Sequence, residues 1–292
     1  MPAPGVRRVR PALVVIAANS GPSGRTVATP TEVGTNATEK SGVAAQHANT
    51  TSAPSSATGT PPLSVRDSEP IELVLGCAPF LGLVLSITRG VMVPRTETEL
   101  LARTSIDALQ AQPAPRVIDM CCGAGNLAVA IAHFVPMARV WAADLTDACV
   151  ETARSNVDLL LLSERAHVHQ GDMFAAFDGL ALEDTIDAIV CNPPYLSTHR
   201  LEHEKSGLLR HEPREAFDAG PYGLSLHRRA LAEGAPFLRD GGWLICEFGV
   251  GQAKQIEMLF DRTHCYGPVR FGHDEHGEPR VAMAQRSARS PR

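Results

Sequence analysis

The chain has 292 residues, of which 44% are hydrophobic and 20% are charged, and its formal net charge at pH 7 is −5. This length and apolar content are enough for one large α/β domain with an appendage. No apolar run approaches the ~20 residues of a membrane-spanning helix, so we predict no membrane partner. The acidic balance gives no overall attraction to phosphates, which argues against nucleic acid as the main partner.

The N-terminal segment differs in composition from the rest of the chain. Between residues 18 and 62 it is rich in Ser, Thr, Ala, Gly, Pro and Asn and almost lacks large apolar side chains. Such a segment cannot bury enough surface to offset the entropy lost on ordering. We therefore predict a disordered low-complexity tail over residues 1–62 and a flexible, Arg-rich tail over residues 286–292.

The pattern of cysteines indicates the compartment. The chain has seven Cys and no CxxC motif. Cys149, Cys191 and Cys246 fall within apolar helix or strand patterns, where a thiol acts as a small hydrophobic group. This usage is typical of a reducing compartment, and the apolar stretch 11–18 is minimal for a signal peptide. We therefore predict a cytoplasmic protein.

A β-hairpin is predicted ahead of the main domain, in a linker over residues 63–95. Two stretches with apolar residues at alternate positions, 71–75 and 81–87, suit its two strands. A helix is expected to follow over residues 97–110.

Helical and strand patterns then alternate along residues 96–285. Such alternation implies a parallel sheet with helices on both faces, so we predict a Rossmann-like α/β domain with a seven-stranded, mostly parallel sheet. Strands are expected at 116–119, 138–143, 166–169, 186–191 and 243–248 and near Val269 and Val281; helices are expected at 126–134, 147–162, 224–238 and 251–260, with a long loop at 196–223.

A turn containing two glycines follows the first strand of this domain. The sequence Cys121-Cys122-Gly123-Ala124-Gly125 separates an apolar strand from the start of a helix. In an open parallel sheet, ligands bind beyond the carboxyl ends of the strands, and glycine lets the backbone approach a ligand closely. A GxG after a strand is a weak signal alone, because a plain tight turn has the same pattern.

Two acids at later strand ends strengthen the case for a nucleotide-like ligand. Asp144 ends the next strand, about 20 residues beyond the glycines, where a carboxylate accepts hydrogen bonds from ribose hydroxyls. Asp172 follows the third strand and is placed to accept from an adenine amino group. The competing assignment is a dinucleotide enzyme. The turn lacks the complete G-x-G-x-x-G, and no hydride-handling residue stands out, so S-adenosylmethionine fits better.

The sequence Asn192-Pro193-Pro194-Tyr195 follows the buried strand predicted at 186–191. Two successive prolines fix φ and remove two backbone donors, which leaves the carbonyls of Asn192 and Pro193 free to accept hydrogen bonds. The Asn192 side-chain oxygen is a further acceptor, and Tyr195 offers a flat face for stacking. This turn is suited to holding a planar NH2 group.

With these motifs together, the chain resembles the class I S-adenosylmethionine-dependent methyltransferases, and among them the release-factor glutamine N5-methyltransferases (the HemK/PrmC-like family). The resemblance extends from Pro70 to about Met283 and includes Pro94-Arg95-Thr96-Glu97, Glu212-Pro213-Arg214 and the run from Gly241 to Gln252. Cys121 stands where the family usually has a glycine, and Thr96 where it usually has a proline.

The resemblance implies a role for each matching residue. Asn192 and Pro193 would accept the hydrogens of the substrate amide and Tyr195 would form part of the wall around it, so these three are the catalytic candidates. The implied substrate-binding residues are Arg95, Glu99, Asn192, Pro193, Pro194 and Tyr195. The implied cofactor-binding residues are Asp119, Cys121, Gly123, Gly125, Asp144, Leu145, Asp172, Met173 and Asn192.

The expected substrate is the side-chain amide of a glutamine in a peptide chain release factor. Two alternatives remain open: a small-molecule amide or amine in a biosynthetic pathway, and a nucleic-acid base. We predict no metal, although His199 and His203 have the i, i+4 spacing of a zinc pair, because no Cys pair accompanies them and the stretch is charged and loop-like.

Overall fold

The computed structural model describes residues 69–288. The disordered tail that we predict over residues 1–62 lies outside the described residues, as do residues 289–292. The description below concerns the described part of the chain.

Seven strands form one sheet in the order β5-β4-β3-β6-β7-β9-β8. The strands from β5 to β7 in that order pair in parallel, whereas β9 runs antiparallel to both β7 and β8. The predicted seven-stranded, mostly parallel sheet is confirmed. The strands are β3 (Arg116–Met120), β4 (Arg139–Asp144), β5 (Ala166–Gln170), β6 (Ile186–Cys191), β7 (Leu238–Glu247), β8 (Arg270–His273) and β9 (Pro279–Gln285).

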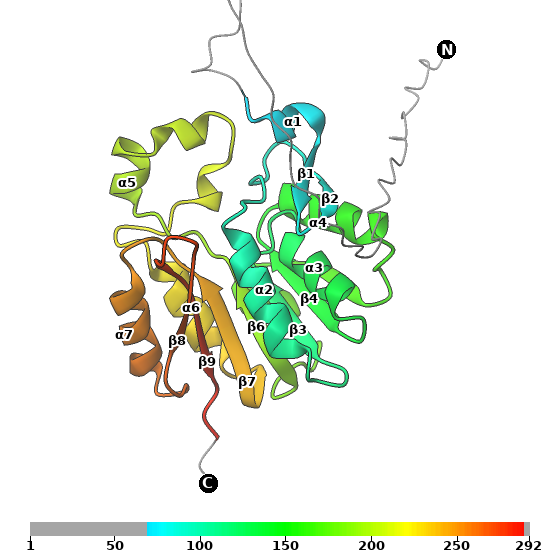
Figure 1. Cartoon of the computed structure of the whole chain (residues 1–292), viewed down its shortest axis with the longest axis vertical. Coiled ribbons are helices and arrows are strands. Elements are labelled where there is room, and N and C mark those ends of the chain that lie inside the picture. Colours follow the sequence, from blue (N-terminus) through cyan, green and yellow to red (C-terminus); the bar gives the residue numbers. More distant parts are fainter. Residues whose placement is uncertain (1–68, 289–292) are drawn as a thin grey trace, which may run out of the picture. The chain divides into compact units, whose positions relative to one another are not determined.

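Helices cover both faces of this sheet (Figure 1). Successive side chains of a strand point to opposite faces, so Val117 of β3 belongs to one apolar core and Ile118 to the other. The first core takes side chains from α2 (Thr98–Leu109), α3 (Asn126–Phe134) and α4 (Asp147–Leu159); the second takes them from η1 (Met173–Phe177), α6 (Ser225–Gly234) and α7 (Ala253–Thr263).

The register of the parallel strands aligns their ends. Met120 of β3 pairs with Ala143 of β4 and with Cys191 of β6, and Cys191 pairs in turn with Cys246 of β7. The residues one position further along the four strands therefore lie level with one another at the carboxyl ends of these strands. These residues are Asp144, Cys121, Asn192 and Glu247.

The predicted hairpin is present but begins later than expected. Its strands are β1 (Cys77–Phe80) and β2 (Leu83–Ser86), whereas the stretch predicted as its first strand is a short helix, α1 (Ile71–Leu75). Pro70 immediately precedes α1, with a φ of −48°, and Gly76 ends it with a φ of +70°. Proline fits the start of a helix and a left-handed glycine its end, so these flanking residues outweigh the alternation inside the stretch.

Two side chains attach the hairpin to the domain. Glu99 of α2 accepts a hydrogen bond from Leu81 N at 2.9 Å through Oε1. Asn156 of α4 is fully buried; its Oδ1 accepts from Ser86 N at 2.7 Å, and its Nδ2 donates to Ser86 O at 3.0 Å and Ala124 O at 2.9 Å. Asn156 thereby connects the hairpin to the glycine turn.

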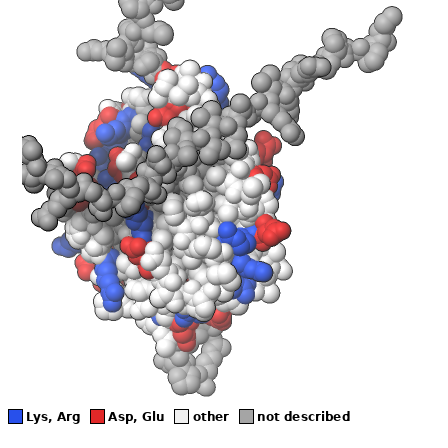
Figure 2. Space-filling view, turned by 45° about the vertical axis from the view of Figure 1, so that its right-hand side comes forward, with Lys and Arg blue, Asp and Glu red and all other residues white. Residues whose placement is uncertain are grey.

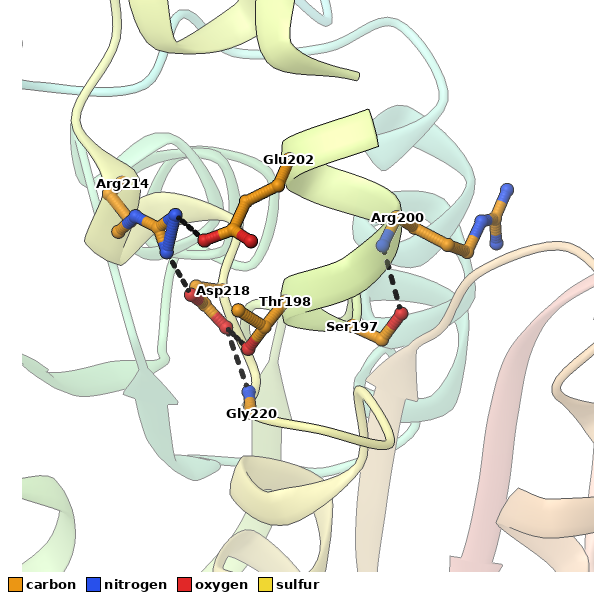
Figure 3. A network of polar contacts seen from close by, with 7 residues as sticks. All are labelled: Ser197, Thr198, Arg200, Glu202, Arg214, Asp218 and Gly220. Atoms are coloured by element: carbon orange, nitrogen blue, oxygen red, sulfur yellow. Dashed lines mark hydrogen bonds and ion pairs between the residues drawn. The ribbon is translucent and has the colours of Figure 1, made fainter. Parts of the chain in front are cut away.

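Residues 196–223, named here the wall segment, were predicted as a loop but contain three short helices. These are α5 (Thr198–His203), η2 (Ser206–Arg210) and η3 (Arg214–Ala216). Arg214 holds the segment together by donating to Glu202 Oε1 at 2.6 Å and to Asp218 Oδ2 at 2.8 Å, as Figure 3 shows. Asp218 also accepts from Thr198 Oγ1 at 2.8 Å. The order of this segment depends on polar contacts between side chains that are distant in the sequence. Such contacts produce no periodic pattern in the sequence.

Arg286, which the sequence assigned to a flexible tail, is only 7% exposed. Its backbone N donates to Gly242 O at 2.8 Å, and its guanidinium donates to Asp184 Oδ1 at 2.8 Å. The ordered domain therefore extends beyond the predicted boundary at residue 285.

Within residues 69–288, no helix is long and apolar enough to cross a membrane. On the face drawn in Figure 2, basic and acidic side chains are interspersed, and a large central area carries few charges. The visible face therefore lacks the single-signed character of a surface that follows a phosphate backbone.

Asn156→Leu should lower the free energy of unfolding by about 2–4 kcal/mol, because it removes the partner of the half-buried Ser86 backbone and of the buried Ala124 carbonyl. Chemical denaturation would measure the change. Glu151→Ala, at an exposed site on the same helix, is the control and should change stability by no more than about 0.5 kcal/mol. Equal effects of the two substitutions would contradict this role for Asn156.

Candidate functional site

A cavity, named here the first cavity, opens at the carboxyl ends of four neighbouring strands. Its lining includes the residues that end or follow each strand: Cys121 and Gly123 after β3, Asp144 and Leu145 at the end of β4, Asp172 and Met173 after β5, and Asn192 and Pro194 after β6. The wall segment closes one side with Pro213, Glu215 and Ala216. The structure thus brings together most of the residues that the resemblance assigns to cofactor binding.

The glycine turn forms one edge of the first cavity through a series of left-handed residues. Cys121, Gly123 and Gly125 have φ values of +59°, +53° and +76°. A Cβ added at Gly125 would lie 3.0 Å from the Cβ of Ala153 on α4, which explains why glycine occupies this position. Cys121 adopts the same conformation despite its side chain, and its Sγ lies 3.9 Å from Met173 Sδ at the cavity.

Asp144 holds the glycine turn from the neighbouring strand. Its Oδ2 accepts from Gly123 N at 2.9 Å, and its Oδ1 accepts from Leu145 N at 2.8 Å. A carboxylate oxygen has two lone pairs; Oδ1 also accepts from Thr146 N at 3.4 Å, whereas Oδ2 has one donor and keeps a free lone pair. The Asp144 carboxylate lies at the first cavity, where Oδ2 can accept a ribose hydroxyl.

Asp172 lies at the cavity, as predicted, but it is engaged by a residue that the sequence analysis missed. Arg229 of α6 donates to Asp172 Oδ1 at 2.7 Å and also pairs with Glu233. The neighbouring Gly171 packs against η1, since an added Cβ would lie 2.7 Å from Ala176 Cα. The contact with Arg229 leaves Asp172 Oδ2 available to a ligand amino group.

Asp119 and Gly125 do not line the first cavity. Asp119 is fully buried behind the turn, where its Oδ2 accepts from Ala128 N of α3 at 2.9 Å. Burial raises the pKa of its carboxyl group to about 8, and within residues 69–288 its Oδ1 has no hydrogen-bond partner. The two residues therefore shape the cavity from behind.

A second cavity lies on the other side of Asn192. Its lining includes Pro193 and Tyr195, the end of β7 with Glu247, Arg280 of β9, and Arg95 and Glu97 ahead of α2. The wall segment contributes Leu196, Arg200, Lys205, Leu208, Ala216 and Phe217. Met92, Asn192 and Ala216 line both cavities. Asn192 is therefore placed where a group in the second cavity meets a group in the first.

The Asn192 side chain has a defined orientation at this junction. Its Nδ2 donates to the hydroxyl of Thr98, the first residue of α2, at 3.0 Å. With the amide nitrogen held in this way, Oδ1 points away from Thr98 and keeps its lone pairs. Among the described residues, no donor contacts Oδ1 or the carbonyl of Pro193. Two of the three acceptors that the sequence predicted, Asn192 Oδ1 and the Pro193 carbonyl, are thus free to receive a planar NH2 group.

Tyr195 is held by Gln252 and Gly249, which follow β7, and by Gly223 at the end of the wall segment. Gln252 Nε2 donates to Tyr195 O at 3.1 Å, and Gln252 Oε1 accepts from Gly249 N at 2.8 Å. A Cβ at Gly249 would lie 3.0 Å from Tyr195 Cδ2, and one at Gly223 would lie 2.6 Å from Tyr195 O. Burial raises the pKa of Tyr195 to about 12, so its hydroxyl stays protonated at neutral pH.

Glu247 is a buried carboxyl group in the second cavity that the sequence analysis did not single out. It is 2% exposed, and its Oε1 accepts from the Tyr195 hydroxyl at 3.5 Å and lies 3.9 Å from an Arg280 guanidinium nitrogen. Burial raises its pKa to about 7. Its Oε2 has no partner within the described part of the chain. The signal in the sequence that identifies Glu247 is its position at the end of an apolar strand, which it shares with Asp144.

Two charged residues near the start of α2 are predicted to bind substrate: Arg95, which precedes the helix, and Glu99, which lies within it. Of these two, only Arg95 lines one of the two cavities. Arg95 lines the second cavity and pairs with Glu212 of the wall segment, which also accepts from Val93 N at 2.9 Å. Glu99 lines neither cavity. Its carboxylate accepts from Leu81 N and pairs with Arg103, and its role in substrate binding stays a prediction.

His199 and His203 lie on α5, with ring centroids 4.5 Å apart. The stretch is therefore helical rather than the loop that we predicted. No group of three or more His, Cys, Asp or Glu side chains suited to a metal ion occurs within residues 69–288.

Comparisons with known proteins agree with this geometry. The family described as "Methyltransferase small domain" matches residues 96–210. A release factor glutamine methyltransferase of Gloeobacter violaceus is 32% identical over 225 residues, which cover 77% of each chain. A 4-amino-L-phenylalanine/4-methylamino-L-phenylalanine methyltransferase of Streptomyces pristinaespiralis is 36% identical over 200 residues, covering 67% of this chain and 66% of that protein.

Among solved structures, a methyltransferase from Pyrococcus furiosus superposes with a TM-score of 0.51 and 15% identity, covering 71% of this chain and 91% of that chain. At this identity the likeness concerns the fold alone. The relative from Gloeobacter violaceus exceeds 30% identity over most of both chains. Sequence, sheet order and relatives together show that this chain belongs to the release factor glutamine methyltransferase family of enzymes.

Proposed function

We propose that this enzyme transfers a methyl group from S-adenosylmethionine to the side-chain N5 nitrogen of a glutamine in a peptide chain release factor. The observation that carries the proposal is the position of Asn192, which lines both cavities and holds a free acceptor at their junction. A donor in the first cavity and an amide in the second would meet at this side chain.

The residues of the first cavity fit S-adenosylmethionine. Asp144 offers an acceptor for a ribose hydroxyl, and Asp172 offers an acceptor for the adenine amino group. Met120, Met173 and Leu226 supply apolar wall for the adenine ring. When bound, the cofactor supplies an electrophilic methyl group on a sulfonium sulfur.

The chain's own residues compensate for the weak nucleophile. A carboxamide nitrogen is poorly nucleophilic because its lone pair is delocalised into the carbonyl. Asn192 Oδ1 and the Pro193 carbonyl would accept the two N–H hydrogens, which aims the nitrogen lone pair at the first cavity and stabilises the positive charge that develops on nitrogen. Tyr195, held by Gln252 and Gly249, would form the wall against which the amide plane lies.

A second candidate substrate is a small aromatic amine. The relative from Streptomyces pristinaespiralis is named for methylation of 4-amino-L-phenylalanine, and an arylamine also presents a planar NH2 group. Family membership supports the release factor as first choice. Nucleic-acid bases remain third, because the chain is acidic overall and the face in Figure 2 has interspersed charges.

We further assign the methyltransferase domain to residues 96–286, one residue beyond the boundary predicted from the sequence, because Arg286 is buried; the hairpin linker is assigned to residues 63–95. A cytoplasmic location is proposed from the seven cysteines, all of which are free thiols, as expected in a reducing compartment.

When the enzyme is incubated with S-adenosylmethionine labelled in its methyl group, label should appear on a glutamine of the release factor. A release factor in which that glutamine is replaced should remain unlabelled. 4-Aminophenylalanine and an oligonucleotide are the competing acceptors in parallel reactions. Label appearing in the arylamine but not in the release factor would overturn the proposed substrate while leaving methyl transfer intact.

Asn192→Ala should reduce turnover by roughly 100-fold or more, because it removes an acceptor at the reacting nitrogen. The cofactor dissociation constant should stay within about threefold, since the substitution leaves the ribose and adenine contacts in place. Steady-state kinetics and calorimetry measure the two quantities. His199→Ala on exposed α5 serves as control, and loss of both turnover and cofactor binding in Asn192→Ala would contradict the assigned role.

Asp144→Ala should weaken cofactor binding by about 10- to 100-fold, because a charge-assisted hydrogen bond to the ribose is lost and the glycine turn loses its anchor. Isothermal titration calorimetry with S-adenosylmethionine tests this. Glu151→Ala, also a loss of one acid but on the exposed side of α4, should bind the cofactor normally. Unchanged affinity in Asp144→Ala would remove this residue from the cofactor site.

A further inference from the structure

Asp172 offers an acceptor to the adenine amino group, yet its own turn does not fix the direction of its carboxylate. It immediately precedes η1, and its side chain caps none of the backbone N–H groups of that helix. The side chain is 62% exposed. Within residues 69–288 its carboxylate is engaged by one group, the guanidinium of Arg229. An exposed carboxylate with a single partner takes its direction from that partner.

The backbone around Asp172 is constrained on both sides. A Cβ added at Gly171 would lie 2.7 Å from Ala176 Cα, so the chain packs tightly on η1 at this point. Met173 has a φ of +53°, which a residue with a side chain keeps when its surroundings hold it there. With the backbone fixed in this way, the side-chain torsions of Asp172 decide where its carboxylate points.

Arg229 is itself held by a second acid. Its Nε and Nη2 donate to Glu233 Oε1 and Oε2 at 2.6 and 3.3 Å, and Glu233 lies one turn further along α6. On the other side of the guanidinium, Nη1 donates to Asp172 Oδ1 at 2.7 Å. Because a guanidinium is planar and its donors form a rigid fork, the pairing of one side with Glu233 directs the other side at Asp172.

The packing of α6 fixes the distance that Arg229 has to span. A Cβ added at Gly234 of α6 would lie 2.8 Å from Phe174 Cζ of η1, so the two helices are in direct contact. Ala230, which follows Arg229, is 1% exposed in the second core. The helix that carries Arg229 and the helix that Asp172 precedes are therefore held against each other by close apolar contacts.

The chemistry of a fixed carboxylate gives this arrangement a consequence for ligand choice. An ionised carboxylate accepts hydrogen bonds and donates none. An amino group at C6 of a purine donates to it, whereas a carbonyl at the same position would face it with lone pairs. A carboxylate that could rotate would turn away from the carbonyl, but one held by Arg229 cannot. Holding the acid still therefore adds rejection of the wrong base to recognition of the right one.

We propose that Arg229, supported by Glu233, is a positioning residue that makes the first cavity select adenine nucleosides over hypoxanthine nucleosides. It acts through Asp172, whose Oδ1 it occupies and whose Oδ2 it presents to the base. The proposal rests on the cofactor named in the proposed function and is independent of the acceptor of the methyl group.

A pair of ligands that differ in the base tests this role. S-Adenosylhomocysteine carries an amino group at C6, and S-inosylhomocysteine carries a carbonyl there and a proton on N1. Calorimetry should show that the parent enzyme binds the adenosyl compound roughly 100-fold more tightly. In Arg229→Met the adenosyl compound should lose about tenfold in affinity, while the inosyl compound stays within about threefold, so the preference should fall to roughly tenfold.

Two controls accompany the substitution. Arg228→Met removes an exposed arginine from the same helix and should keep the preference of the parent enzyme. Methionine keeps the length of the arginine stem, and a partly exposed ion pair contributes little to stability. The melting temperature of Arg229→Met should therefore stay within a few degrees of the parent value.

A preference that is unchanged in Arg229→Met would overturn the proposal, even if both affinities fell, because a purely structural role weakens both ligands alike. The background Asp172→Ala gives a second test. There, a further Arg229→Met should leave the preference unaltered, and a continued effect would show that Arg229 does not act through Asp172.

The outcomes also separate this proposal from the proposed function. If the release factor stays unlabelled while the preference falls in Arg229→Met as expected, the proposed substrate fails and the positioning holds. If the release factor is labelled and the preference does not change, the positioning alone fails. Failure of both compounds to bind the parent enzyme would overturn the cofactor assignment and the positioning together.

Discussion

The parallel pairing of four strands in a fixed register is the constraint on which the site depends. Because β4, β3, β6 and β7 pair level with one another through Ala143, Met120, Cys191 and Cys246, the next residue of each strand emerges at the same edge. Those residues differ in chemistry: two acids, a thiol and an amide. A slip of one residue in any of these strands would turn the side chain at the end of that strand toward one of the two cores. The apolar residues of both cores therefore also fix the positions of the reactive groups.

The same register leaves two carboxyl groups where water does not reach them. Asp119 and Glu247 are both buried, and burial raises their pKa values to about 8 and about 7. For a group with a raised pKa, the stabilising contribution is complete below the ordinary pKa near 4 and is lost as the pH rises through the folded value. The fold therefore carries these acids at a cost to its stability near neutral pH, as is common for groups that serve a site.

Local patterns predicted the repeating part of the fold. The bounds of α3 and β6 agree with the sequence to the residue, because each is a strongly apolar run between clear boundary residues. The first hairpin strand was misassigned because five residues with alternating apolar positions fit either structure, and Pro70 and Gly76 decided for a helix. The wall segment was missed because its helices depend on contacts such as Arg214 with Glu202 and Asp218.

The candidate site was predictable where motif residues touch the cavities, and less so behind them. Asp144 and Asn192 lie where the sequence placed them, whereas Glu99 is occupied by the hairpin. Thr98 and Arg229 act through partners 94 and 57 positions away in the chain, since Thr98 accepts from Asn192 and Arg229 pairs with Asp172. No local pattern encodes such pairs, since only the sheet and its helices bring them together.

Met92, Asn192 and Ala216 are walls of both cavities at once. A single molecule in which a nucleoside is joined by a short linker to a propionamide group would therefore place one end in each of two adjoining cavities. Tethering makes occupation of the second cavity an intramolecular event, so affinity would rise by the effective concentration that the linker sets and not by any new contact. The shared wall makes this enzyme a target for bisubstrate ligands, whose selectivity would come from the amide end.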